Sequence, residues 1–231
     1  MLISKINFKR KNQVNGRKSL YLGMSIAIIN KMKLVIITLL LSLNIAAQSN
    51  NITNYKNQLL KFVPQKFEIM DTVKGNLNND SFDDYILVLK KKNEETTSNY
   101  SDNKPEKRPL LILIGNSDNK LELKARNDNA VLCIDCSGAI HGDSYLGVKI
   151  KNGFFSVEHY TVGGNDKWSK IITFKYDKSK KNWFLHRDGM EFFGWNPDES
   201  PKAEAIIKTG EEILTKKNFG VVLFENYDIY K

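Results

Sequence analysis

The fold class is decided by the stretch Leu146-Gly147-Val148-Lys149-Ile150-Lys151-Asn152-Gly153-Phe154-Phe155-Ser156-Val157-Glu158-His159-Tyr160. Ahead of its centre, apolar side chains alternate with glycine and lysine, which is the period of a half-buried strand. The Asn152-Gly153 pair suits a type I′ turn, because both central residues of that turn require a positive φ. The stretch therefore predicts a β-hairpin of two antiparallel strands.

Further strand patterns lie on both sides of this hairpin. The continuous apolar runs Tyr85–Leu89 and Leu110–Ile114 suit central strands that are covered on two faces. Additional strands are expected at 68–74, 121–125, 168–176, 183–186 and 220–224, and a short amphipathic helix at 50–62, before Pro64. The sequence predicts a mainly β fold of antiparallel sheets, either a sandwich or a partly propeller-like arrangement, with a short N-terminal helix.

The segment 91–108 separates the two apolar runs and has a different composition. It is polar and charged, and its apolar residues show no periodicity. Such a segment is typical of a long mobile loop. We therefore expect one β-rich domain over residues 48–231, with this loop inside it.

The positive charge of the chain is concentrated at its beginning. The whole chain has 35 Lys and Arg against 26 Asp and Glu, a net charge of +9, but residues 1–47 hold eight of the basic residues and no acidic one. The remainder is nearly neutral, with 27 basic residues against 26 acidic ones. Nucleic-acid binding, which the overall charge suggests, is therefore not expected of the domain.

Residues 1–47 have the order of a secretory signal peptide. Met32-Lys33 precedes the mostly apolar run from Leu34 to Ala47, whose 14 residues are fewer than a membrane-spanning helix needs. We expect cleavage after Ala47 or Gln48, export to the periplasm or beyond, and no stable membrane anchor afterwards; an uncleaved anchor is the alternative. Because residues 1–31 are unusual ahead of such a signal, the true start is predicted at Met32, and a long basic leader remains open.

An acidic loop follows the first expected strand. Oxygen-bearing side chains occur at Asn76, Asn78, Asp80 and Asp84, which are loop positions 1, 3, 5 and 9, and the carbonyl of Phe82 occupies position 7. Ca²⁺ takes six to eight oxygen ligands, and this spacing can wrap such a cation. A turn held by Asx-type hydrogen bonds, without a metal, is the alternative.

This loop resembles the Gly-Asp-x-Asn-x-Asp-Gly-x-x-Asp loops of secreted FG-GAP/VCBS-type, integrin-α-like β proteins. The resemblance implies a bound Ca²⁺ and covers one copy of about 15 residues. Two departures are expected to weaken binding. Asn76 replaces the usual Asp and removes a charge, and Ser81 replaces the usual Gly of a positive-φ turn.

A second resemblance covers roughly residues 70–190. The segment 126–138, with Gly142-Asp143, His159-Tyr160, Gly163-Gly164 and Trp168, is similar to a family of uncharacterised secreted bacterial proteins. Their shared elements are Asn-Asp-Asn-x-Val-Leu-Cys-x-x-Cys-x-Gly, Gly-Asp and His-Tyr-x-x-Gly-Gly. The resemblance implies a fold and an exported location, and no reaction.

The only two cysteines, Cys133 and Cys136, form a Cys-x-x-Cys motif within a turn. A local disulfide is the first interpretation, because an exported protein meets an oxidising compartment and no helix N-terminus is expected here to activate a thiolate. A redox-active pair is the alternative, as is a zinc site completed by His141 or His159.

A second set of candidate residues comprises His141, Asp143 and His159. His141 and Asp143, with Ser137 or Ser144, could act in a small hydrolase, but no nucleophile motif accompanies them. His159 shares a strand face with apolar residues and is expected in the core. The predicted function is therefore non-catalytic binding of a protein or glycan of unknown identity. A small periplasmic enzyme, either a thiol–disulfide protein or a hydrolase, is the alternative.

Overall fold

The computed structural model describes residues 55–138, 142–161, 167–198, 200 and 202–231. The expected signal segment 1–47, the start at Met32 and the candidate His141 lie outside these residues. The chain divides into a unit from Met1 to Asn57, of which only the last three residues are described, and a compact unit from Gln58 to Lys231. Within the described ranges, no helix is long and apolar enough to cross a membrane.

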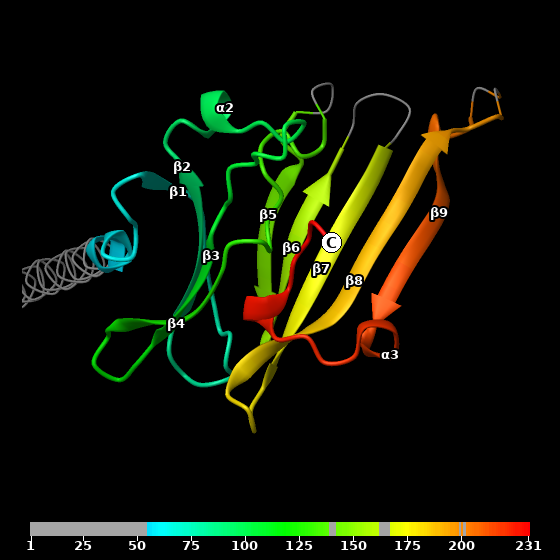
Figure 1. Cartoon of the computed structure of the whole chain (residues 1–231). Helices are drawn as coiled ribbons and strands as arrows, with labels where there is room; N and C mark the ends of the chain where they lie inside the picture. Colours follow the sequence, from blue (N-terminus) through cyan, green and yellow to red (C-terminus); the bar gives the residue numbers. More distant parts are fainter. Residues whose placement is uncertain (1–54, 139–141, 162–166, 199, 201) are drawn as a thin grey trace, which may run out of the picture. The chain divides into compact units, whose positions relative to one another are not determined.

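The compact unit is built almost wholly from strands (Figure 1). In chain order its elements are β1 (Phe67–Gly75), β2 (Asp84–Lys91), α2 (Glu94–Thr97), β3 (Leu110–Gly115), β4 (Leu121–Asn127), β5 (Tyr145–Lys151), β6 (Phe154–Tyr160), β7 (Lys167–Asp177), β8 (Asn182–Trp195), β9 (Ile206–Thr215), α3 (Lys216–Phe219) and the 3-10 helix η1 (Phe224–Asn226). Residues 55–60, ahead of β1, are helical, in line with the helix expected there.

The strands form two antiparallel sheets, which confirms the predicted fold class. One sheet has the order β1-β2-β3-β4 and the other β5-β6-β7-β8-β9. Strands that pair within a sheet are therefore always consecutive in the sequence. The apolar runs predicted to be central are β2 and β3, and most of their residues are buried. Continuous apolar sequence is what a strand with two covered faces requires.

The Asn152-Gly153 hairpin joins β5 to β6 as predicted. Lys151 pairs with Phe154, which leaves two residues in the turn, and φ is 50° at Asn152 and 77° at Gly153. A side chain at Gly153 would also collide with the amide of Asn79 in the acidic loop. Glycine is therefore required here both by the turn and by the close approach of that loop.

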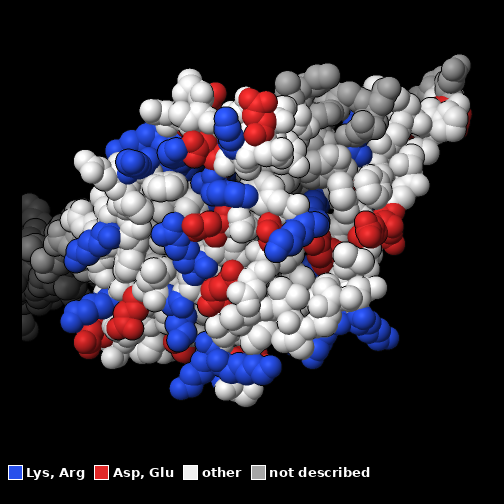
Figure 2. Space-filling model, in the orientation of Figure 1, with Lys and Arg blue, Asp and Glu red and all other residues white. Residues whose placement is uncertain are grey.

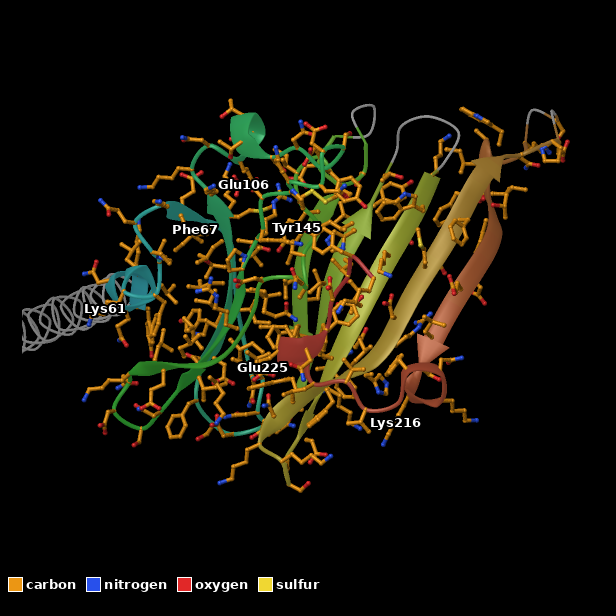
Figure 3. The ribbon with its side chains drawn as sticks, viewed as in Figure 1. Lys61, Phe67, Glu106, Tyr145, Lys216 and Glu225 are labelled. Carbon is orange, nitrogen blue, oxygen red and sulfur yellow. A yellow bond between two sulfur atoms is a disulfide. The ribbon has the colours of Figure 1, made fainter. Side chains whose placement is uncertain are left out.

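One core lies between the two sheets and includes residues from both. Side chains fill the space between the sheets (Figure 3). In this core the rings of Phe155 and Phe174 stack with centroids 4.9 Å apart, and Phe224 meets both rings edge-on. The indole Nε1 of Trp183 on β8 donates to the carbonyl of Leu77, 3.1 Å away, and so ties the second sheet to the acidic loop. The shared core corresponds to the sandwich alternative.

Near the end of the chain one strand prediction was wrong, and one strand was not predicted. Gly220–Phe224 is not a strand: Leu223 makes only an isolated bridge with Phe184, and η1 follows. The buried side chain of Asn127 donates to the carbonyl of Phe224 and, at 2.8 Å, to that of Tyr227, so these carbonyls do not enter a ladder. Strand β9 was not predicted, because most of its residues are half-buried or exposed and leave no alternating pattern.

The segment expected to be a long loop, 91–108, contains more structure than its composition suggested. It includes α2 and an isolated bridge between Asn99 and Lys104. Its two buried charged residues are Glu94 and Arg108. The buried side chains of this segment form an ion pair and are not apolar. A search for apolar periodicity therefore could not reveal that the segment is structured.

Candidate functional site

The acidic loop connects β1 to β2, and Asp84 anchors it. The carboxylate of Asp84 is fully buried at the start of β2. One oxygen accepts the Leu77 N–H at 2.7 Å, and the other accepts the Gly115 N–H of β3 at 3.1 Å. Burial raises the pKa of Asp84 above its ordinary value, although the backbone hydrogen bonds oppose this change. Asp84 thus joins the loop to the neighbouring strand end.

The outer part of the loop is organised by Asn78 and Asp80. The Asp80 N–H donates to Asn78 Oδ1 at 3.0 Å, and the Phe82 N–H donates to Asp80 Oδ1 at 2.8 Å. The Asn78 amide also donates to Asp80 Oδ2 at 2.6 Å. The hydrogen bonds of the Asx-turn alternative are therefore present. Each of these oxygens has a second lone pair, so the same geometry leaves them able to coordinate a cation.

The loop offers an oxygen-rich donor set for a hard cation. The side-chain oxygen of Asn76 is buried and has no hydrogen-bond partner in the described part of the chain. Its amide nitrogen donates to the carbonyl of Asp80. The predicted ligands include only two carboxylates, Asp80 and Asp84, and no group of three or more His, Cys, Asp or Glu suited to a metal occurs among the described residues. The orphaned oxygen of Asn76 suits Ca²⁺, a cation satisfied by neutral and charged oxygens alike, whereas both oxygens of Asp84 already accept backbone N–H groups and would bind it only through their remaining lone pairs.

Backbone hydrogen bonds connect this loop to the second sheet. The Gly153 N–H in the β5–β6 turn donates to the Asn76 carbonyl at 3.2 Å. The Gly153 carbonyl in turn accepts the Tyr176 N–H of β7 at 2.8 Å. The acidic loop is therefore joined through a single glycine to the end of β7.

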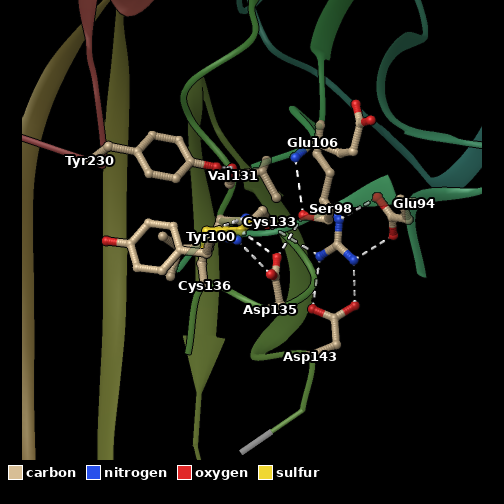
Figure 4. The surroundings of a disulfide bond; sticks show 12 residues. Glu94, Ser98, Tyr100, Glu106, Val131, Cys133, Asp135, Cys136, Asp143 and Tyr230 are labelled. Carbon is tan, nitrogen blue, oxygen red and sulfur yellow. Dashed lines mark hydrogen bonds and ion pairs between the residues drawn. A yellow bond between two sulfur atoms is a disulfide. The ribbon is translucent and has the colours of Figure 1, made fainter. Parts of the chain in front are cut away.

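Cys133 and Cys136 are joined by a disulfide bond, as predicted (Figure 4). Cys133 is fully buried, and the bridge leaves neither sulfur as a thiolate for redox or zinc chemistry. Between them, Asp135 accepts the Ser98 hydroxyl at 2.6 Å and the Tyr100 N–H at 2.7 Å. Burial raises the pKa of Asp135, but these hydrogen bonds outweigh it and lower the pKa below its ordinary value. An ionised carboxylate beside the sulfurs disfavours thiolate formation.

Asp143, a candidate residue of the hydrolase alternative, belongs to an ion cluster around the buried Arg108, beside the disulfide (Figure 4). Its two oxygens accept from Nη1 and Nη2 of Arg108, each at 2.7 Å. Arg108 also donates to Glu94, at 2.6 and 3.1 Å, and to the Leu132 carbonyl at 3.2 Å. Burial opposes the charge on Arg108, but the hydrogen bonds to Asp143 and Glu94 outweigh it and raise its pKa. The sequence contained no signal for this cluster beyond an arginine next to an apolar run.

His159 lies in the core, as expected. It is almost fully buried, and its Nε2 accepts the Leu132 N–H at 3.2 Å. Burial lowers the pKa of His159 to about 3, so the imidazole is neutral near pH 7. Leu132 therefore contacts both His159 and Arg108, and it brings His159, Asp143 and the disulfide into one neighbourhood. The link between these residues is the backbone of Leu132, whose N–H donates to His159 and whose carbonyl accepts from Arg108.

The comparisons with known proteins give no relative for this chain. No protein-family model matches it, and neither a curated protein nor a solved structure matches it significantly. The function is therefore inferred from its own residues.

Proposed function

We propose that this chain is an exported β-rich protein that binds a ligand without converting it. The observation that carries the proposal is the state of Asp143, whose two carboxylate oxygens are both taken up by the buried Arg108. A carboxylate held in this way is a poor partner for orienting a catalytic histidine, which must exchange protons with its surroundings. The bridged cysteines and the buried, neutral His159 support the same conclusion.

Two rate measurements test the non-catalytic part of this proposal. We expect no insulin-reduction activity above that of a Cys133→Ser/Cys136→Ser variant, and no hydrolysis of p-nitrophenyl acetate above that of an Asp143→Asn variant. A wild-type rate that either variant abolishes, while its far-ultraviolet circular dichroism stays native, would establish the enzyme alternative. Isothermal titration with glycan fragments and with peptides then tests for binding.

Export is supported by the signal-like residues 1–47 and by the disulfide, since disulfides persist in oxidising compartments. Expression of the full chain in a Gram-negative host should place the protein outside the cytoplasm, with a mature N-terminus near Gln48. Mass spectrometry after alkylation should find both cysteines bridged. An uncleaved, cytoplasmic protein with free thiols would contradict this part of the proposal.

The acidic loop is proposed to bind Ca²⁺ through Asn76, Asn78, Asp80, Asp84 and the carbonyl of Phe82. The FG-GAP/VCBS-like spacing and the unpartnered Asn76 oxygen support this assignment. When bound, the cation would neutralise carboxylate charge and stiffen the loop between β1 and β2. Within this proposal Ca²⁺ has a structural role, and no chemical step depends on it.

Calorimetric titration with Ca²⁺ tests the loop directly. We expect millimolar Ca²⁺ to release or absorb heat and to raise the melting temperature, because a ligand that binds only the native state stabilises it. An Asp80→Asn variant should lose both effects. Asp118→Asn, which removes the same charge from an exposed turn, is the matched control and should keep them. The absence of heat and of a melting shift in the wild-type protein would end the calcium assignment.

A further inference from the structure

A second site is indicated by a hollow in the five-stranded sheet. It has a volume of about 490 Å³ and lies between the turn joining β7 to β8, the first residues of β8, and the segment from α3 to Val221. Its volume is within the range of small-molecule sites. Lys216 on α3, labelled in Figure 3, forms part of its lining. None of the residues proposed for calcium, the disulfide or the ion cluster lines it.

The lining of this hollow carries an excess of positive charge. The lining contains one carboxylate, that of Asp177, and four lysines: Lys175, Lys178, Lys180 and Lys216. No carboxylate in the described part of the chain forms an ion pair with any of the four lysines. Figure 2 shows blue Lys and Arg side chains along the lower edge, over the β7–β8 turn and α3.

Three lysines elsewhere on the same sheet have acidic partners, in contrast to the four lysines of the hollow. On that sheet Lys149 lies 2.6 Å from Glu158, Lys170 lies 2.7 Å from Asp188, and Lys208 lies 2.8 Å from Glu191. Like charges gathered in a concave surface raise the local concentration of anions.

Asp177, the single carboxylate of the lining, offsets one of the four lysine charges and is held in place by its own turn. One of its oxygens accepts the Ser179 N–H at 2.9 Å, the Ser179 hydroxyl at 2.6 Å and the Lys180 N–H at 3.2 Å. Two of the lysines are also held over aromatic rings: Lys175 lies 5.2 Å from the centroid of Phe154, and Lys180 lies 4.8 Å from that of Phe184. Such contacts restrict the lysine side chains without neutralising them.

The rest of the lining combines Tyr176, His186 and Gly220 with three apolar residues. These are Phe184, the buried Leu185 and Val221, which is 60% exposed. An apolar wall beside convergent cationic groups is the usual construction of a site for a small charged molecule. We propose that this hollow binds a small organic ligand carrying at least two anionic groups on a partly apolar body, such as an acidic sugar or a sugar phosphate. This inference rests on the proposed binding function and supplies its ligand class.

Isothermal titration of the purified protein with three anions and one neutral sugar tests the site. The probes are digalacturonate, glucose 1,6-bisphosphate and pyrophosphate, with maltose as the neutral control. Lys178→Gln/Lys216→Gln removes one lining charge from the turn and one from α3. Lys181→Gln/Lys217→Gln removes the neighbouring charges, which lie outside the lining, and is the matched control. Thermal melting checks that both double variants fold.

We expect at least one of the two organic anions to bind with a dissociation constant below about 1 mM, which is weak binding by the usual scale. The lining variant should weaken that binding about tenfold and the control variant less than about threefold, since solvent screens the more distant charges. Binding should also weaken as salt is raised. Whether digalacturonate or the bisphosphate binds identifies the source of the anionic groups.

Three results would overturn the site: no heat with any anion, equal weakening in both double variants, or pyrophosphate binding as tightly as the organic anions. The first two would mean that the hollow has no specific role, and the third that its apolar walls contribute nothing. None of these results contradicts the proposed binding function, which could use another surface. Conversely, an organic anion that binds and is recovered chemically altered would refute the non-catalytic function and leave the site in place.

Discussion

Replacing Arg108 with methionine should destabilise the fold more than any exposed charge substitution, because it leaves a buried carboxylate without its positively charged partner. Arg108 donates two hydrogen bonds to Glu94 and two to Asp143. The Asp143 side chain is 34% exposed and can be hydrated after the substitution, whereas the Glu94 side chain is 1% exposed and cannot. Breaking a buried ion pair from one side costs about 3–5 kcal/mol. We therefore expect the free energy of unfolding to fall by roughly 4 kcal/mol.

Urea unfolding at neutral pH, followed by circular dichroism without reductant, measures this loss. In a thermal scan the same loss lowers Tm by roughly 8–16 °C for a domain of this size. Arg126→Met is the control, because the Arg126–Asp128 pair is half exposed and should be worth less than about 1 kcal/mol. Adding Glu94→Leu to Arg108→Met should recover part of the lost stability, since no buried charge is then left without a partner. The reasoning is refuted if Arg108→Met costs no more than Arg126→Met.

Three further predictions concern single features of the core. Burial lowers the pKa of His159 to about 3, so between about pH 6.5 and 3 the unfolded chain binds a proton that the native chain does not. Stability should therefore fall as the pH falls through this window, and His159→Gln, which keeps an acceptor for Leu132, should show a flatter pH profile of urea midpoints. Removing the disulfide by Cys133→Ser/Cys136→Ser should cost about 2 kcal/mol, because the closed loop is very short; a loss above about 4 kcal/mol would show that the bridge does more than close this turn. Asp84→Asn should cost about 1–3 kcal/mol in the same assay, since a buried N–H then faces another donor, and an unchanged midpoint would contradict the anchoring role of Asp84.

The parts of the fold that were predictable are those encoded by neighbouring residues. The turn between β5 and β6 could be identified because Asn152 and Gly153 are the residues that tolerate positive φ. The central strands β2 and β3 could be identified because burial on both faces requires apolar residues throughout. The disulfide could be inferred because its cysteines lie three positions apart.

The ion cluster was not predictable, because its members lie far apart in the sequence. Glu94 is 14 positions and Asp143 is 35 positions from Arg108, and charged side chains are rarely buried. Strand β9 was missed for a related reason, since its half-exposed residues follow no simple period. The hollow with four lysines also joins two remote segments, the β7–β8 turn and α3, and only the folded chain brings them together.

The glycine contact between the two sheets has a consequence for ligand binding. Gly153 is hydrogen-bonded on one side to Asn76 of the acidic loop and on the other to Tyr176, which lines the hollow with the four lysines. If the loop takes up a cation and the hollow an anion, the two equilibria share this short backbone connection. If binding at one site changes the affinity at the other, thermodynamic linkage requires the reverse effect to have the same factor. The affinity for one ion would then depend on whether the other is bound.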